Sequence, residues 1–303
     1  MKDQNIAKSQ TEPISKIVGT LFILSAALCW ALSGTAAKHI FLMGISPTVL
    51  VQMRATVAGS LVALWVGINS PNLFKFRLKD LPRFILLGLV GMALLQYTYL
   101  YAISRIHVAV AILIQYMAPV FIFLWCLVFG DKKPTMLTSL TILGTVIGCY
   151  FVSGASEVDI SQLDLWGIAG GLGAAISFAY YSLTAEGLVE RYDPRTVILY
   201  ALLFSSITWN LVESPFAFVY ACANPSFLFW GLFVVLVGTL IPFSLYTLGI
   251  TRVSSVNASI TATTEPIFAG IISWCFIGEA LSFPQMAGAA LVLASIAVLT
   301  AKG

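Results

Sequence analysis

Charged residues are scarce in this sequence. They make up 10% of the 303 residues, and hydrophobic residues make up 59%, whereas soluble domains are about 25% charged and about 45–50% apolar. So few charges cannot form the polar shell that a soluble core of this size requires, and the apolar surface must therefore face lipid. The composition predicts an integral membrane protein.

Several chemical signatures are also missing. The net charge of +3 is small and the basic residues are dispersed, which argues against a nucleic-acid partner. The five cysteines stand singly, without CxxC pairs, and the two histidines lie far apart in the chain, so we predict no metal site. HExxH, GxSxG, Walker A and Gly-rich dinucleotide motifs do not occur. We therefore predict no cofactor and no enzymatic activity.

Apolar stretches separated by short polar segments fill most of the chain. A helix needs about 20 residues to cross a hydrocarbon core about 30 Å thick. The first stretch is too long for the 7–15-residue core of a cleaved signal peptide, so it is predicted to be the first membrane helix. The sequence predicts ten transmembrane helices, at 17–37, 48–68, 84–103, 108–129, 137–153, 166–185, 196–213, 227–250, 256–277 and 285–301.

Lysine and arginine predict the orientation of these spans. Of the 16 basic residues, 13 fall in the tails and loops of one side, Lys38 and Arg105 fall on the other, and Arg54 lies inside a span. Because cytoplasmic loops collect basic residues, both termini are predicted to be cytoplasmic. The basic segment 71–83 is either a loop that holds this topology or a stretch along the membrane interface.

The two halves of the chain resemble each other. Adding 147 to Pro47, Tyr99, Arg105 and Pro119 gives another proline, tyrosine, arginine and proline, and near the start of each half Gly19 and Trp30 match Gly167 and Phe178 at an offset of 148. Five helices are an odd number, so the second repeat must be inverted relative to the first. We predict a cytoplasmic tail at 1–16, repeats at 17–153 and 166–301, and an extracytoplasmic linker at 154–165.

Pro119 and Pro266 occupy equivalent places about halfway along spans four and nine. A proline there removes a backbone hydrogen bond and frees carbonyl groups that lipid cannot satisfy. Paired interruptions in corresponding spans indicate a transport site between inverted repeats. A packing kink is the alternative interpretation.

Glu265 is an acid predicted to lie deep within a span, and Arg54 is the candidate cation inside a span. A charge at the bilayer centre costs about 2.5–3.5 kcal/mol on insertion scales, so Glu265 is expected to face protein or water. It could bind a substrate amine, carry a proton or pair with a cation. Arg54 could pair with Glu265, extend toward the outer interface or bind a substrate carboxylate.

Further polar and aromatic residues lie within the predicted spans. Gln115 and Tyr116 immediately precede the Pro119 break and are therefore predicted substrate contacts. Trp30 and Asn257 complete the predicted set of substrate-binding or coupling residues, although Tyr and Trp near span ends are usually interfacial anchors.

The chain resembles the EamA-type transporters of the drug/metabolite transporter superfamily. The resemblance covers about residues 17–301 and rests on Cys-Trp-Ala-Leu-Ser-Gly at 29–34 with Lys38, on Arg54, and on Ala-Pro-Val-Phe at 118–121. Its most specific part is Glu-Pro-Ile-Phe at 265–268, followed by Ile-Gly-Glu at 277–279 and Gly288. It implies a ten-helix basket with a central cavity and frequent export of amino acids. The first repeat departs from its partner by ending in Gly-Asp-Lys at 130–132.

We therefore predict an all-α integral membrane protein of a bacterial plasma membrane, with ten transmembrane helices as two inverted five-helix repeats. Its predicted function is secondary transport, as an exporter of amino acids or related small metabolites by alternating access. Its partners would be a small-molecule substrate, the lipid bilayer and protons as a candidate coupling ion. The alternatives are a channel or scramblase-like facilitator and, with one deep acidic group, a membrane-embedded enzyme. The sequence specifies neither the substrate nor the oligomeric state.

Overall fold

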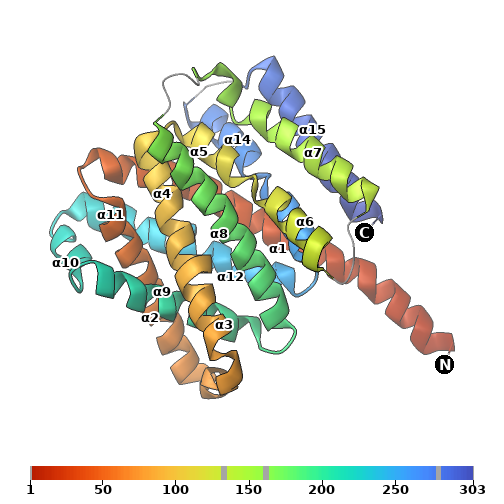
Figure 1. Ribbon diagram of the computed structural model, residues 1–303, viewed down its shortest axis with the longest axis horizontal. Coiled ribbons are helices and arrows are strands. Elements are labelled where there is room, and N and C mark those ends of the chain that lie inside the picture. The colour runs from red at the N-terminus through yellow and green to blue at the C-terminus, as the bar shows by residue number, and fades with distance from the viewer. Residues whose placement is uncertain (1, 131–134, 160–163, 278–280, 303) are drawn as a thin grey trace.

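The computed structural model describes residues 2–130, 135–159, 164–277 and 281–302, and these residues form helices joined by short loops (Figure 1). The first half of the chain contains α1 (Lys2–Leu42), α2 (Pro47–Asn69), η1 (Pro71–Phe74), η2 (Leu78–Asp80), α3 (Leu81–Leu86), η3 (Leu87–Leu94), α4 (Leu95–Arg105), α5 (Val108–Gln115), α6 (Ala118–Phe129), α7 (Met136–Val152) and, in the predicted linker, η4 (Ala155–Glu157). The second contains α8 (Leu165–Val189), α9 (Pro194–Val212), α10 (Ala217–Ala221), α11 (Pro225–Val235), η6 (Leu236–Leu240), α12 (Ile241–Ile250), α13 (Ser255–Ala262), α14 (Glu265–Ile277) and α15 (Phe283–Lys302).

Each of the ten predicted spans corresponds to a helix or to consecutive helical pieces. Within the described residues, eight of them are long and apolar enough to cross a membrane. The other two are α7, an apolar helix of 17 residues, and the interrupted pair α13 and α14. Helix α1 begins at Lys2, within the predicted tail, and its apolar span begins at Ile14. Residues 131–134 and 278–280, which include the divergent ends of the fourth and ninth spans, lie outside the described residues.

Corresponding helices of the two repeats pack against each other in opposite directions. Between α2 and α9, Gln52 Nε2 donates to Asn210 Oδ1 at 3.0 Å, and one turn further along α2, Thr56 accepts from Ser206 at 3.2 Å. Residue numbers rise on one helix as they fall on the other. Helices α7 and α15 also run side by side (Figure 1). The confirmed architecture is therefore an all-α membrane protein of two repeats, and these pairings are those of an inverted repeat.

The first helix of each repeat packs against the third span of the other. A Cβ added at Gly19 of α1 would lie 2.7 Å from Arg252 Cβ, and one added at Gly167 of α8 would lie 2.6 Å from Ile106 Cγ2 and 3.2 Å from Arg105 Cβ. Gly19 and Gly167 are equivalent by the repeat, as are Arg252 and Arg105. Glycine permits these backbones to approach closely. Equivalent residues of the two halves thus make equivalent contacts across one interface.

Both predicted helix breaks are present. Helix α5 ends at Gln115 and α6 starts at Ala118, with Pro119 in its first turn; α13 ends at Ala262 and α14 starts at Glu265, with Pro266 in its first turn. Proline is tolerated in a first turn, where its missing N–H would have had no intrahelical acceptor.

Two π-helical segments also lie at equivalent places in the repeats. Segment η3 covers Leu87–Leu94, and η6 covers Leu236–Leu240, which corresponds to 89–93 at an offset of 147. A π-helical turn widens the helix, and such turns are frequent at functional sites. Neither segment carries a sequence signal that predicts a π-helical turn.

Candidate functional site

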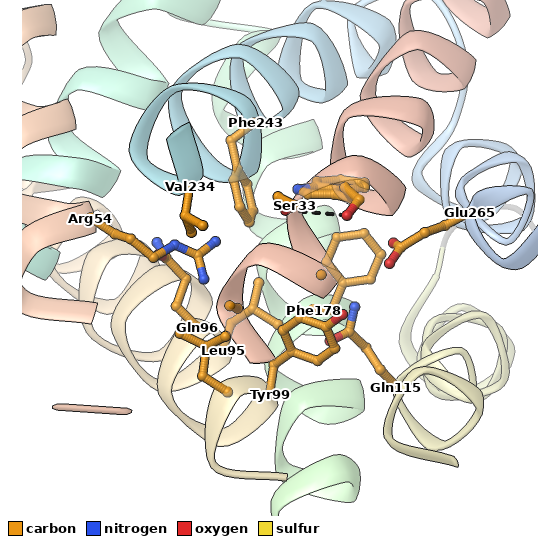
Figure 2. A pocket seen from close by; sticks show the side chains of 14 residues that line it. Ser33, Arg54, Leu95, Gln96, Tyr99, Gln115, Phe178, Val234, Phe243 and Glu265 are labelled. Carbon is orange, nitrogen blue, oxygen red and sulfur yellow. Dashed lines mark hydrogen bonds between the residues drawn. The ribbon is translucent and has the colours of Figure 1, made fainter. Parts of the chain in front are cut away.

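A narrow cavity lies between the two repeats, and side chains of both repeats line it (Figure 2). Its volume is about 30 Å³, which is room for about two water molecules, since each needs at least about 10–15 Å³ on this measure. In this conformation the cavity cannot hold a metabolite. Its lining comprises Trp30, Ser33, Gly34, Ala37, Arg54, Leu95, Gln96, Tyr99, Leu100, Gln115, Phe178, Val234, Phe243 and Glu265.

Glu265 enters the cavity from the first residue of α14. The break before Pro266 places this carboxylate at a helix N-terminus, where free N–H groups favour negative charge. Its side chain is buried, and Tyr116 Oη donates to Glu265 Oε2 at 2.5 Å. Tyr99 also interacts with the carboxylate. Two phenols from the first repeat thus hold the buried acid of the second.

Arg54 lies across the cavity from Glu265 (Figure 2). Its Nε donates to Thr239 Oγ1 at 2.8 Å and its Nη2 donates to the Gly238 carbonyl at 2.9 Å, both in the η6 segment. Arg54 is 5% exposed, so it does not extend to the interface. Among the described residues it forms no salt bridge with Glu265 within 4.0 Å. The cavity is therefore flanked by two separate groups that can carry opposite charges.

Two amide side chains at the cavity have unused hydrogen-bonding capacity. Neither Oε1 nor Nε2 of Gln96 has a partner among the described residues, and Gln115 Oε1 also lacks one. Gln96 is buried, at 2% exposed. Leaving a buried polar group without a partner costs about 1–3 kcal/mol, so these atoms are expected to bind water or a ligand.

Aromatic side chains form one wall of the cavity. The Trp30 ring packs edge-on against Phe178 at 5.9 Å and Phe243 at 5.3 Å, and lies 5.7 Å from Tyr246. Trp30 and Phe178 are equivalent by the repeat. The cavity thus offers a broad apolar surface between its two ionisable groups, an arrangement typical of small-molecule sites.

The structure brings most of the predicted site residues together. Trp30, Arg54, Gln115 and Glu265 line the cavity, and Tyr116 is buried behind Glu265. Pro119 and Pro266 lie in the first turns of α6 and α14 and shape the breaks without lining the cavity.

Asn257 lies elsewhere, in a second pocket near Lys16 and Arg252. Gln96 and Tyr99 also line the cavity, although they are not among the predicted site residues. Their signal was present, because each is a polar residue inside an apolar span, but other polar residues shared it.

The fold defines a multi-pass membrane protein whose two inverted repeats enclose a small cavity lined by polar, charged and aromatic side chains. The sequence matches the EamA-like transporter family over residues 17–154 and again over 165–301. The chain belongs to this family and is a transporter.

Curated relatives extend the similarity over nearly the whole chain. An uncharacterized inner membrane transporter, YicL of Salmonella typhimurium, is 26% identical, over 93% of this chain and 95% of the relative. The threonine/homoserine exporter RhtA of the same species is 24% identical, over 91% and 89%. One solved crystal structure superposes with a TM-score of 0.73 at 17% identity, covering 93% of this chain and 96% of the other. That likeness supports the fold.

Proposed function

We propose that this protein is a secondary transporter that exports amino acids or related small zwitterions from a bacterial cell by alternating access. The observation that carries the proposal is the placement of Arg54 and Glu265 on opposite sides of one buried cavity, without a salt bridge between them among the described residues. An α-amino acid carries a carboxylate and an ammonium group, which these two side chains complement.

The other lining residues fit the same class of substrate. Gln96 and Gln115 supply unpartnered amide atoms that can bind polar groups of a ligand. Trp30, Phe178 and Phe243 supply an apolar wall for its carbon chain. The threonine/homoserine exporter among the relatives supports both the substrate class and the direction of transport.

The small cavity volume favours alternating access over an open channel. A space of about 30 Å³ has to widen before an amino acid enters. The equivalent contacts of α1 with α12 and of α8 with α4 allow the two halves to exchange conformations, as inverted repeats do in other transporters. An open channel or scramblase would have a continuous path, whereas the described residues enclose a cavity of about 30 Å³.

Glu265 is the proposed coupling group. When a proton occupies the carboxylate, its charge attraction for the substrate ammonium is lost, so proton binding and substrate binding compete at one site. A proton that reaches Glu265 from the outer side would then release the substrate to that same side. Tyr116 and Tyr99 hold the carboxylate in place for either occupant.

Transport in liposomes tests this proposal. Purified wild-type protein and Glu265→Gln are reconstituted, and uptake of labelled amino acids is measured with and without a proton gradient and as counterflow. We expect saturable, gradient-stimulated uptake by the wild type, and loss of the gradient effect but retention of exchange in the variant. Equal gradient stimulation in both proteins would exclude Glu265 as the proton carrier, and uptake without counterflow would indicate a channel.

A further inference from the structure

One pair of equivalent tyrosines has different hydrogen-bond partners in the two repeats. Tyr99 of α4 and Tyr246 of α12 correspond at the offset of 147. In the second repeat, Tyr246 Oη lies 2.8 Å from Ser182 Oγ of α8, and both side chains are buried. At the offset of 148, the counterpart of Ser182 is Gly34 of α1. The first repeat therefore lacks the hydroxyl that Tyr246 binds.

The geometry around Gly34 supports this correspondence. Among the described residues, the nearest neighbour of a Cβ added at Gly34 would be Tyr99 Oη, at 3.8 Å. A serine oxygen is one bond further from the backbone than Cβ, so from this position it would reach hydrogen-bonding distance of the phenol. Helices α1 and α4 thus hold positions 34 and 99 in the way that α8 and α12 hold positions 182 and 246.

The donor hydrogen of Tyr246 is taken up within its own repeat. A hydroxyl group has a single hydrogen to donate. Ser182 Oγ donates its hydrogen to the Phe178 carbonyl at 2.8 Å. The oxygen of Ser182 can therefore act toward Tyr246 Oη only as an acceptor, and Tyr246 donates to it.

Tyr99, without a serine at position 34, turns to the other repeat. Its side chain lines the cavity, and its hydroxyl interacts with the carboxylate of Glu265 (Figure 2). Tyr116 Oη donates to the same carboxylate at 2.5 Å. A carboxylate has about four lone-pair sites, so two phenols leave about two sites for the ammonium group of a ligand.

A second pair of positions shows the same asymmetry. Tyr181 Oη and Thr247 Oγ1 lie 2.7 Å apart between α8 and α12, and both side chains are buried. Their equivalents between α1 and α4 are Ser33 and Leu100. Together with Gly34 and Tyr99, these two line the cavity, whereas the four second-repeat counterparts, all among the described residues, do not. The hydroxyl groups between α8 and α12 bind each other, and the matching positions between α1 and α4 face the cavity.

We infer that Gly34 is a positioning residue: by withholding a hydroxyl partner from Tyr99, it directs the Tyr99 hydrogen to the carboxylate of Glu265. Phenols of the first repeat then fix the carboxylate of the second repeat in the orientation that receives an ammonium group. That this ligand is the transported substrate rests on the proposed function, whereas the hydrogen bonding of Tyr99 does not.

A double-mutant cycle tests the bond without any substrate. Tyr99→Phe and Glu265→Leu are made singly and together in full-length protein, and midpoints of thermal unfolding are measured in detergent. We expect the two shifts to be non-additive by about 3–6 °C in the wild type and in Gly34→Ala. In Gly34→Ser they should be additive, because the introduced hydroxyl accepts the Tyr99 hydrogen. Gly34→Ala is the matched control, since its Cβ makes an ordinary contact at 3.8 Å.

Tyr246→Phe with Glu265→Leu forms the repeat-matched cycle. We expect additive shifts there, because Ser182 accepts the Tyr246 hydrogen. This comparison does not depend on how well Gly34→Ser folds. Additive shifts for Tyr99→Phe and Glu265→Leu in the wild type, or an equally large coupling of Tyr246 to Glu265, overturn the inference. Equal coupling in Gly34→Ser and Gly34→Ala overturns the role of Gly34.

A transport measurement separates this inference from the proposed function. Uptake of labelled amino acids into liposomes is expected to be about tenfold slower for Gly34→Ser than for Gly34→Ala, because the carboxylate loses one donor. Adding Tyr99→Phe to Gly34→Ser should slow uptake no further. If the proposed function is wrong, the wild type transports no amino acid but the thermal coupling persists. If the inference is wrong, wild-type transport remains and the coupling is absent or is unchanged by Gly34→Ser.

Discussion

Arg54 in the first repeat donates from Nη2 to the carbonyl oxygen of Gly238, in the π-helical turn of the second repeat, at 2.9 Å. A second bond, from Nε to Thr239 Oγ1 at 2.8 Å, holds the guanidinium plane. Arg54 Nη1 takes part in neither bond. The arginine therefore ties the two halves together and orients its remaining donors at the cavity wall.

Arg54→Lys is expected to lower transport by about tenfold or more. An ammonium group cannot make both bonds with the planar geometry of the guanidinium, and a hydrogen bond to a charged group contributes about 1.5–3 kcal/mol. Initial rates of uptake in liposomes measure the effect. Arg105→Lys is the matched control, because its guanidinium lies in the solvent-accessible pair with Asp164; equal rates for both variants would contradict a specific role for Arg54.

Tyr116→Phe is expected to reduce substrate-dependent transport by about tenfold, because loss of a bond to a carboxylate costs about 1.5–3 kcal/mol. Tyr116 Oη is 2.5 Å from Glu265 Oε2. Tyr246→Phe serves as the control: it removes another buried hydroxyl, which bonds to Ser182 at 2.8 Å. We expect it to lower stability with a smaller effect on uptake. The pair of variants is compared by kinetics of uptake and by thermal unfolding in detergent.

Gln96→Leu is expected to raise thermal stability while weakening transport. Its amide atoms lack partners among the described residues, so leucine removes a desolvation penalty of about 1–3 kcal/mol but also a ligand contact. Gln52→Leu is the opposite case, since Gln52 bonds to Asn210, Ser214 and Phe218. That variant should be less stable than the wild type. A Gln96→Leu protein that unfolds earlier yet transports normally would show that Gln96 is structural.

Gly288→Ala is expected to destabilise the α7–α15 pair by about 1–3 kcal/mol, as overpacking does in other tight contacts. A Cβ at this position would lie 2.6 Å from both Gly148 O and Val152 N, which are backbone atoms. Gly187→Ala on α8 is the control, because a Cβ there meets nothing within 4 Å. It should stabilise the protein by about 0.5–1 kcal/mol. The midpoint of thermal unfolding is measured in detergent for both variants. Equal shifts in the two midpoints would contradict tight packing at Gly288.

The fold was largely predictable from the sequence because it depends on one-dimensional signals. A span requires a minimum number of apolar residues, and the repeat is visible as an offset of 147 or 148. Pro119 and Pro266 also predicted where the fourth and ninth spans are interrupted. Helices α7 and α13–α14 match their predicted segments despite falling short of a full-length continuous span.

The site was predictable only in part. Arg54 and Glu265 stood out because charges within spans are rare, and both line the cavity. Asn257 is also a polar residue within a span but lines the second pocket, near Lys16 and Arg252, since depth along a helix does not specify the direction of a side chain. The equivalent π-helical segments, whose turns depend on packing against the other repeat, have no comparable signature in the sequence.

By itself, the sequence determined the membrane location, the ten spans, their repeat and the two interruptions, because each follows from hydropathy, length or backbone chemistry along one chain. The tertiary structure decided which polar groups meet. It left Arg54 bound to Gly238 instead of to Glu265, placed Tyr116 against the carboxylate and left Gln96 without a partner among the described residues. Those outcomes depend on the distances between side chains on different helices, which only packing of the two halves defines.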